Sequence, residues 1–253
     1  DAGYHRPRNV KRGVRWKELV VRLTGPVVAE IDAVFVTDWF SETDEMLPLG
    51  AAVRAADDAL HRAPATAVVT RVEAQVVPSG PSFENDNNLK LFVLMIQNAR
   101  HRISVTSPYF VPEEATLLAL ITAASRGADV ELFVSAVGDQ VMVYHAQRSY
   151  YEVLLRAGVK IYLHRAPVVL HAKHFSIDGD MAVIGTSNMD IRSFSLNMEV
   201  SLLVRGREFV DEMRKVEDDY RRNSDQLTLQ AWASRSAWEK TLDSMARLTS
   251  SLQ

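Results

Sequence analysis

Residues 170–188 decide the fold, and they read Leu-His-Ala-Lys-His-Phe-Ser-Ile-Asp-Gly-Asp-Met-Ala-Val-Ile-Gly-Thr-Ser-Asn. An Asp-Gly pair at positions 178 and 179 separates two alternating apolar runs, which is a strong signal for a β-hairpin. We therefore predict one strand at residues 172–177 and a second, antiparallel strand at residues 181–185. This hairpin also carries most of the polar residues that we assign to a functional site.

The turn of this hairpin has two two-residue alternatives. If residues 178–179 form it, His171 faces Thr186; if residues 179–180 form it, His171 faces Asn188. Because strand side chains alternate between the two faces, both alternatives place the same polar group on one face. That group comprises His171, Lys173, Thr186 and Asn188. A three-residue turn would break this arrangement.

These side chains together form a site suited to a phosphate. Lys173 supplies positive charge, and Thr186 and Asn188 supply hydrogen-bond donors. His171 can attack a substrate or transfer a proton. Glu199, which begins a later predicted strand, is expected to hold His171 in one tautomer. A metal site is disfavoured because an ammonium group among the ligands repels a cation, so we expect neither metal nor cofactor.

Strand and helix patterns alternate along most of the chain, which is typical of an α/β sheet covered by helices on both faces. The predicted strands are residues 18–23, 67–77, 103–106, 130–134, 159–163, 172–177, 181–185 and 199–204. The predicted helices are residues 27–39, 88–100, 113–125, 141–157, 208–222 and 228–250. Residues 41–64 are rich in alanine and acidic residues without a clear strand, so we place a domain boundary there.

A shift of 181 positions aligns two strand-glycine-helix segments without a gap, which indicates a repeated structural unit. Glu18 falls on Glu199, and the Asp-Trp pair at 38–39 falls on the Asp-Tyr pair at 219–220. Coincidence is the alternative, since strand-glycine-helix units are common. A duplication makes residues 1–62 the end of a first half plus a linker and residues 63–253 a second, catalytic half. The counterpart of His171 would then lie about ten positions before the first residue, since 171 minus 181 is negative.

Composition limits the function classes. The 29 Lys and Arg residues against 32 Asp and Glu residues give a formal net charge of −3, which disfavours nonspecific nucleic-acid binding. Cysteine is absent, which excludes thiol nucleophiles, disulfides and cysteine-bound metals. No uninterrupted apolar run approaches the roughly 18 residues that a membrane span requires.

The polar residues of the hairpin resemble the signature of the phospholipase D superfamily: His-x-Lys, four residues, Asp, six residues, Gly-Ser-x-Asn. Residues 171–188 match it at every spacing, with Thr186 replacing the serine and Asp178 as the aspartate. Neighbouring stretches resemble the bacterial cardiolipin synthase branch. These stretches are residues 16–18, 25–26, 78–81, 107–112, 147–151, 188–193 and 197–199.

The resemblance implies a phospholipase D-type mixed sheet flanked by helices, as one half of a duplicated fold. It implies a phosphatidyl transferase that makes cardiolipin from two phosphatidylglycerols through a phosphatidyl-histidine intermediate, with His171 as the general acid and base. The implied catalytic residues are His171, Lys173, Asp178, Asn188 and Glu199. We also expect Thr186, Ser187, Tyr109 and Arg148 to bind the substrate, Tyr109 because it follows a predicted strand and Arg148 through a lipid phosphate. By the repeat, Glu18 is the first-half counterpart of Glu199.

The implied partners are phosphatidylglycerol, other anionic phospholipids and a membrane surface, and the expected location is the bacterial cell membrane. The site requires a second motif, from a missing amino-terminal half or from a second copy of the chain. Nucleic acid is not an expected partner. One alternative is a phospholipase D-like phosphodiesterase or nuclease acting as a dimer of single-motif chains, and another is an inactive docking module.

Several residues also have structural interpretations. Asp178 suits a tight turn, Tyr109 suits core packing, and Arg148 suits a solvated helix face. Basic residues between 6 and 17 suit either anionic lipid headgroups or a loop beside a phosphate. In the last helix, Trp238, Leu242 and Met245 form an apolar stripe, for which we favour core packing over lipid contact.

Overall fold

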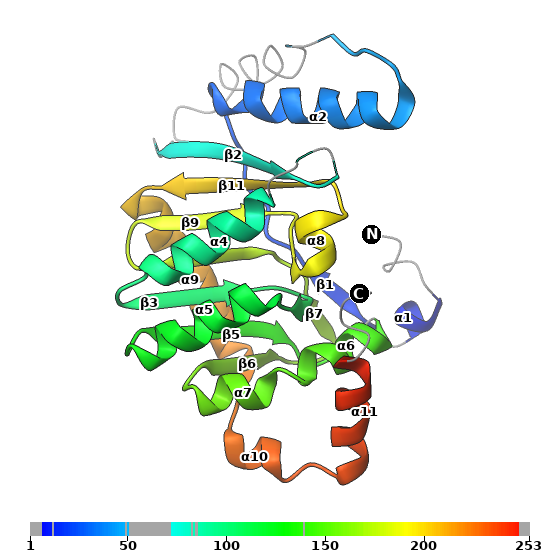
Figure 1. Ribbon diagram of the computed structural model, residues 1–253, viewed down its shortest axis with the longest axis vertical. Coiled ribbons are helices and arrows are strands. Elements are labelled where there is room, and N and C mark those ends of the chain that lie inside the picture. The colour runs from blue at the N-terminus through cyan, green and yellow to red at the C-terminus, as the bar shows by residue number, and fades with distance from the viewer. Residues whose placement is uncertain are drawn as a thin grey trace.

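A mixed sheet forms the centre of the computed structural model, which describes residues 7–11, 13–48, 50, 72–81, 83, 86–138 and 140–247. The strand order is β12-β6-β5-β3-β8-β9-β11-β2 (Figure 1). These strands are β2 Glu73–Ser79, β3 Arg102–Thr106, β5 Asp129–Ser135, β6 Lys160–His164, β8 His174–Ile177, β9 Met181–Gly185, β11 Glu199–Arg205 and β12 Ser224–Leu227. The parallel group β3-β5-β6 continues into antiparallel strands, which confirms the predicted mixed α/β class.

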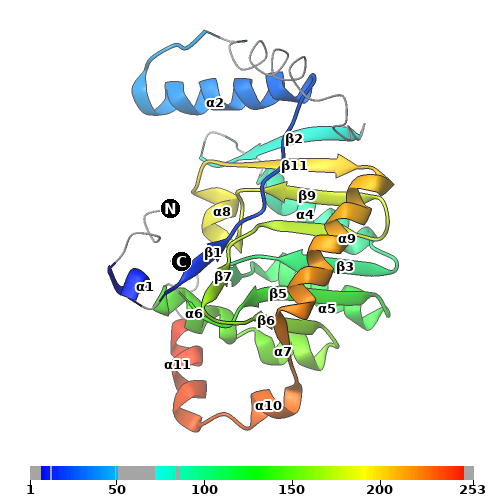
Figure 2. The ribbon, with the colours of Figure 1, turned by 180° about the vertical axis from the view of Figure 1, so that it is seen from behind.

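Helices cover both faces of the sheet. One face carries α4 Asn87–Asn98, α5 Glu114–Ser125, α6 Val141–Arg148 and α7 Tyr151–Arg156, and α9 Arg207–Arg222 crosses the other (Figures 1 and 2). The other helices within the described residues are α1 Pro7–Lys11, α2 Val27–Thr43, α8 Ile191–Ser195, α10 Leu229–Ala233 and α11 Ala237–Arg247. Because helices cover both faces of the sheet, the central strands are almost fully buried, unlike strands that have one solvent-exposed face.

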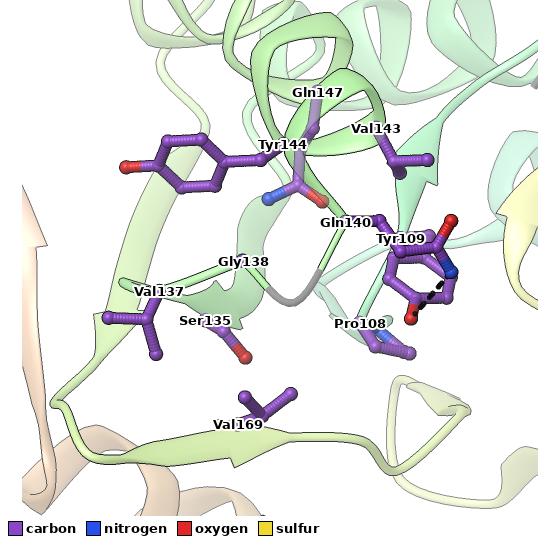
Figure 3. Close-up of a pocket in the computed structure, with 10 residues that line it drawn as sticks. All are labelled: Pro108, Tyr109, Ser135, Val137, Gly138, Gln140, Val143, Tyr144, Gln147 and Val169. Carbon is purple, nitrogen blue, oxygen red and sulfur yellow. Dashed lines mark hydrogen bonds between the residues drawn. The ribbon is translucent and has the colours of Figure 1, made fainter. Parts of the chain in front are cut away.

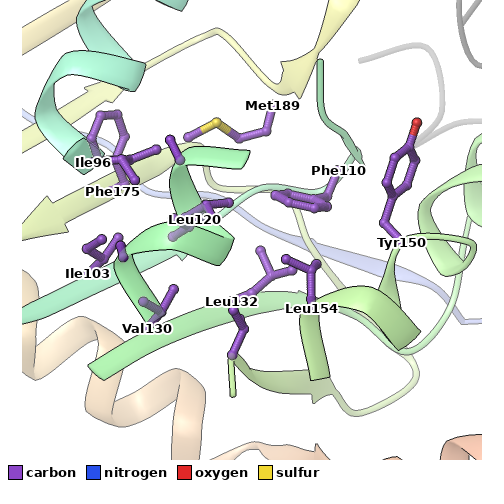
Figure 4. Packing of buried hydrophobic residues seen from close by; sticks show 14 of the residues in the cluster. Ile96, Ile103, Phe110, Leu120, Val130, Leu132, Tyr150, Leu154, Phe175 and Met189 are labelled. Carbon is purple, nitrogen blue, oxygen red and sulfur yellow. The ribbon is translucent and has the colours of Figure 1, made fainter. Parts of the chain in front are cut away.

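The main core lies between the sheet and the α4-α5-α7 layer (Figure 4). Ile103, Leu132 and Phe175 of the sheet pack there with Ile96 of α4 and Leu120 of α5. Burying an apolar side chain of this size contributes about 1.5–3 kcal/mol. The long apolar runs of the sequence are therefore sufficient to place the central strands.

Two short parallel pairs lie at the carboxyl ends of the central strands. β1 Arg15–Lys17 pairs with β7 Val168–Leu170, and β4 Phe110–Val111 pairs with β10 Met189–Asp190. The first pair brings the beginning of the chain against the segment that precedes the phospholipase D-like motif. The second connects the end of that motif to the strand-end segment that contains Tyr109.

Most predicted elements are confirmed within a few residues, but three are wrong. Residues 18–23 do not form a strand; their apolar side chains instead pack on β9 and β11. The helix predicted at 141–157 divides into α6 and α7. The helix predicted at 228–250 divides into α10 and α11, because Ser236 and Glu239 form a reciprocal capping box that starts a new helix.

The predicted two-residue hairpin turn is also wrong. Ile177 pairs with Met181, so the turn contains three residues, 178–180. Asp178 adopts a left-handed conformation with φ of 51°. The alternation that placed His171 and Lys173 on one face with Thr186 and Asn188 therefore does not hold. The proposed domain boundary at residue 62 and the first part of the strand predicted at 67–77 lie outside the described residues.

Candidate active site

His171 owes its position to the parallel pairing of β1 with β7. In that register Lys17 is the partner of Leu170, and the His171 backbone N–H donates to the Lys17 carbonyl at 2.9 Å. The next residue of each segment therefore lies beside the other. His171 Nδ1 is 2.7 Å from Glu18 Oε1, which makes Glu18 the carboxylate that holds the ring.

This contact corrects the expected partner of the histidine. The sequence predicts Glu199 in the orienting role, whereas the structure places Glu18 there, the residue that the repeat aligns with Glu199. Glu199 lies at the start of β11 and accepts a hydrogen bond from Asn197 at 3.4 Å. The sequence repeat identifies Glu18 as a candidate. It does not predict that Glu18 contacts His171, because that contact depends on the pairing register of β1 with β7.

Lys173 provides the positive charge of the site. Its Nζ lies 3.1 Å from Nδ1 and 3.3 Å from Nε2 of His171 and donates to the His171 carbonyl at 2.7 Å. Only 14% of the His171 side chain is exposed, whereas 40% of Glu18 is exposed. The ring is therefore held between a carboxylate and an ammonium group.

The later residues of the motif have separate positions. Thr186 Oγ1 accepts from the Val200 N–H at 3.0 Å, and Thr186 lines a cleft of about 240 Å³ together with Leu19, Val20, Val21 and Leu23. The Ser187 hydroxyl is buried and accepts a hydrogen bond from Asn88. Asn188 is half-buried, and its Oδ1 is buried without a hydrogen-bond partner among the described residues. Its convergence with His171 remains a prediction.

Tyr109 borders the histidine, as expected for a strand-end residue. Its ring lies edge-on to the His171 ring with centroids 6.3 Å apart. The Tyr109 hydroxyl accepts from Gln140 at 3.1 Å, beside a cavity of about 10 Å³ (Figure 3). Gln147 fixes the same loop, because its Oε1 accepts from the Phe110 N–H at 2.9 Å. Gln140 and Gln147 were missed as site residues, since only the fold brings α6 beside the loop.

Asp178 stabilises the hairpin turn and lies away from the histidine. Its carboxylate accepts from the backbone N–H groups of residues 100, 101 and 102 at 2.8–3.0 Å. Partial burial alone would raise the pKa of Asp178, but these hydrogen bonds lower it below its ordinary value. The aspartate of the motif is therefore structural, which agrees with the turn interpretation.

Arg148 belongs to a different cluster. Its guanidinium pairs with Asp243 at 3.3 Å and with Glu239 at 3.6 Å, and it stacks over the Trp232 ring. Its charge is already matched by carboxylates of α11. The expectation that Arg148 binds a lipid phosphate therefore has no support in the geometry.

His174 does not contribute a second acid or base. The side chain is buried, and burial together with the charge of Arg214 lowers the pKa of His174 to about 3. It therefore stays neutral near pH 7. The described residues contain no cluster of His, Asp and Glu suited to a metal ion. They also contain no helix that is both long and apolar enough to cross a membrane.

Comparisons with known proteins find relatives in sequence and in fold. A family model described as "Cardiolipin synthase, PLD-like domain" matches residues 92–219. Cardiolipin synthase A of Yersinia pseudotuberculosis is 32% identical over 232 residues, which are 90% of this chain and 46% of that protein. The same protein of Yersinia pestis gives the same values. The chain therefore spans about half the length of the curated relatives it matches.

Two solved structures show the same fold at low sequence identity. Phosphatidylserine synthase of Haemophilus influenzae matches with a TM-score of 0.62 and 14% identity, covering 89% of this chain and 61% of that one. Nuc of Salmonella typhimurium, a phospholipase D family member, matches with a TM-score of 0.54 and 18% identity, covering 62% of this chain and 99% of that one.

Proposed function

Since this chain belongs to the phospholipase D-like domain family of cardiolipin synthases, we propose that it is the second half of an enzyme that joins two phosphatidylglycerols. The products are cardiolipin and glycerol. The observation that carries the proposal is the placement of the His171 ring between Glu18 and Lys173. A histidine with a carboxylate on one nitrogen and a cation beside it suits proton transfer next to a phosphate.

The proposed reaction has two steps. In the first, a histidine of another motif attacks the phosphorus of one phosphatidylglycerol, the bond to the glycerol oxygen breaks, and His171 gives that oxygen a proton. In the second, His171 takes the proton from the hydroxyl of another phosphatidylglycerol. That oxygen attacks the phosphorus, displaces the histidine and forms cardiolipin.

Each neighbour of His171 has a role in this scheme. Glu18 stabilises the ring while it carries the proton, and Lys173 attracts the phosphate and stabilises the negative charge that develops on its oxygens. Lys173 also favours release of the proton from the ring. The two opposing charges allow one histidine to serve as acid and then as base.

The attacking histidine has to come from outside residues 1–253, because the remaining histidines of the chain lack the motif. Two observations support an intramolecular source. The chain covers 46% of its matched relative, and Glu18, which the repeat assigns to a first half, contacts the histidine of the second. By the same symmetry we expect Glu199 to hold the first-half histidine. We retain residues 1–62 and 63–253 as the proposed division.

The test is phosphatidyl transfer by the complete enzyme, with the preceding half restored and phosphatidylglycerol as the substrate. We expect His171→Ala to abolish cardiolipin formation, measured by mass spectrometry of the lipid products. His101→Ala is the matched control, because His101 is exposed and alanine keeps the backbone N–H that donates to Asp178. Normal transfer by the His171→Ala enzyme would refute the proposal.

A further inference from the structure

The carboxy-terminal helix α11 is fixed in orientation by its buried face. Asp243 is 3% exposed and lies 2.8 Å from His145 Nδ1 of α6. Arg148 and Arg235 pair with the same carboxylate. The His145 ring and two guanidinium groups therefore anchor α11 to α6 and the preceding loop, and the guanidinium groups neutralise the buried carboxylate of Asp243. The side of α11 opposite Asp243 consequently faces away from α6.

That opposite side exposes large apolar groups. Trp238 is 69% exposed and Met245 is 61% exposed, although the i, i+4, i+7 stripe favoured core packing. Leu242, between them, is half-buried. A rigid helix that presents tryptophan and methionine to water indicates a contact surface, because exposed apolar groups that cluster commonly mark interfaces.

A second exposed apolar pair lies on α6, beside the active site. Val141 and Met142, at the start of α6, are both more than half exposed. The preceding residue, Gln140, donates to the Tyr109 hydroxyl, and the Tyr109 ring contacts His171. A short chain of contacts therefore links the exposed apolar groups to the histidine.

Exposed cations lie on the same side of the molecule. Figures 1 and 2 both place α1 and β1 on the side that carries α6 and α11. Lys11 and Arg15 are exposed there, and Arg247 in the last turn of α11 is exposed above the Tyr150 ring. Apolar side chains beside Lys and Arg complement a membrane that contains anionic lipid, and tryptophan favours the interfacial region.

We propose that this surface, formed by Val141, Met142, Trp238 and Met245 with Lys11 and Arg247, docks on an anionic bilayer. Docking places the headgroup region near Tyr109 and His171. The choice of lipid as the partner rests on the proposed function, since the substrate of the site is then a component of the bilayer. Binding to the bilayer itself requires no catalysis.

Vesicle binding by the 253-residue chain tests this surface. The probe is co-sedimentation with vesicles of equal parts phosphatidylglycerol and phosphatidylcholine, compared with phosphatidylcholine alone. We expect Trp238→Ser/Met245→Ser to bind the anionic vesicles about tenfold more weakly or worse, because two apolar side chains no longer enter the interface. Val141→Ser/Met142→Ser should also weaken binding. Agreement between the two variants shows that the loss does not come from misfolding of one of them.

The matched control is Leu94→Ser/Leu118→Ser, which changes two leucines on α4 and α5 that are 58% and 61% exposed. This variant should bind like the parent chain. Equal binding by all variants would overturn the proposal. A second result would also overturn it. If the parent chain is a dimer in sedimentation velocity, and Trp238→Ser/Met245→Ser is a monomer that still binds the vesicles, the surface is a contact between two copies of the chain. Cardiolipin formation from detergent-dispersed lipid by the complete enzyme is measured separately, so a failure of the proposed function is distinguishable.

Discussion

Replacing Glu18 by glutamine removes the charge beside His171 and keeps the shape of the side chain. Glu18 Oε1 is 2.7 Å from His171 Nδ1, a distance typical of a charge-assisted hydrogen bond. Such bonds contribute about 1.5–3 kcal/mol. Since Glu18 is 40% exposed, water screens part of this interaction, so we take about 2 kcal/mol as its contribution to the protonated ring. In the complete enzyme that corresponds to a roughly 30-fold lower kcat.

The assay is steady-state cardiolipin formation, with KM and kcat determined separately. The main effect should be on kcat, because Glu18 acts on the proton-transferring ring and not on the lipid. Glu152→Gln is the control, since it breaks an exposed ion pair with Arg156 on α7, away from the site. Nitrogen NMR of the His171 ring gives a second readout. Glu18→Gln should change its Nδ1 signal, whereas Glu199→Gln should leave it in place.

A kcat within twofold of the parent enzyme, together with an unchanged ring signal, would refute the orienting role of Glu18. A changed ring signal in Glu199→Gln alone would instead restore the partner expected from the sequence.

Three other substitutions test the remaining assignments. Lys173→Gln should reduce kcat by about 10²–10³, because it removes a charge that stabilises the transferring phosphate, and a smaller change than tenfold would contradict that role. Asp178→Ala should lower the free energy of unfolding by about 2 kcal/mol at pH 7 in urea titrations, since three backbone N–H groups lose their acceptor. The pKa of Asp178 is lowered in the folded state, so its stabilisation is complete above the ordinary value of 3.8 and is lost as the pH falls through the lowered pKa. The difference between variant and parent should therefore shrink in acid to the cost of alanine at the left-handed φ of 51°, and a difference that stays constant with pH would disprove the carboxylate explanation. Arg148→Ala should lower stability by about 1–2 kcal/mol, because Asp243 loses one of its partners, while KM for phosphatidylglycerol stays unchanged; a raised KM would restore the lipid-binding interpretation.

The sequence was sufficient to place the hairpin but not its register. Two apolar runs around Asp-Gly predict where the strands lie, because local pattern determines burial. The turn length depends on Asp178, whose carboxylate binds backbone groups about 77 residues earlier. That contact forms only once β3 lies beside β8, so no local pattern in residues 170–188 contains it.

The candidate site likewise has one part that the sequence predicts and one part that depends on the fold. The spacing of His171 and Lys173 follows from the motif, and their contact is local. The Glu18 contact joins residues 153 positions apart through a three-residue parallel register, which the sequence alone does not specify. In contrast, the sequence does contain the signal that divides the last predicted helix into α10 and α11, because Ser236-x-x-Glu239 is a capping box.

The most direct test of the central proposal is to locate the phosphatidyl group on the enzyme. The complete enzyme is mixed with phosphatidylglycerol, quenched in acid, digested and analysed by peptide mass spectrometry. If His171 is the acid and base, we expect the adduct on a histidine outside residues 1–253 and none on the peptide that contains His171. An adduct on His171 would contradict that assignment and make this histidine the nucleophile.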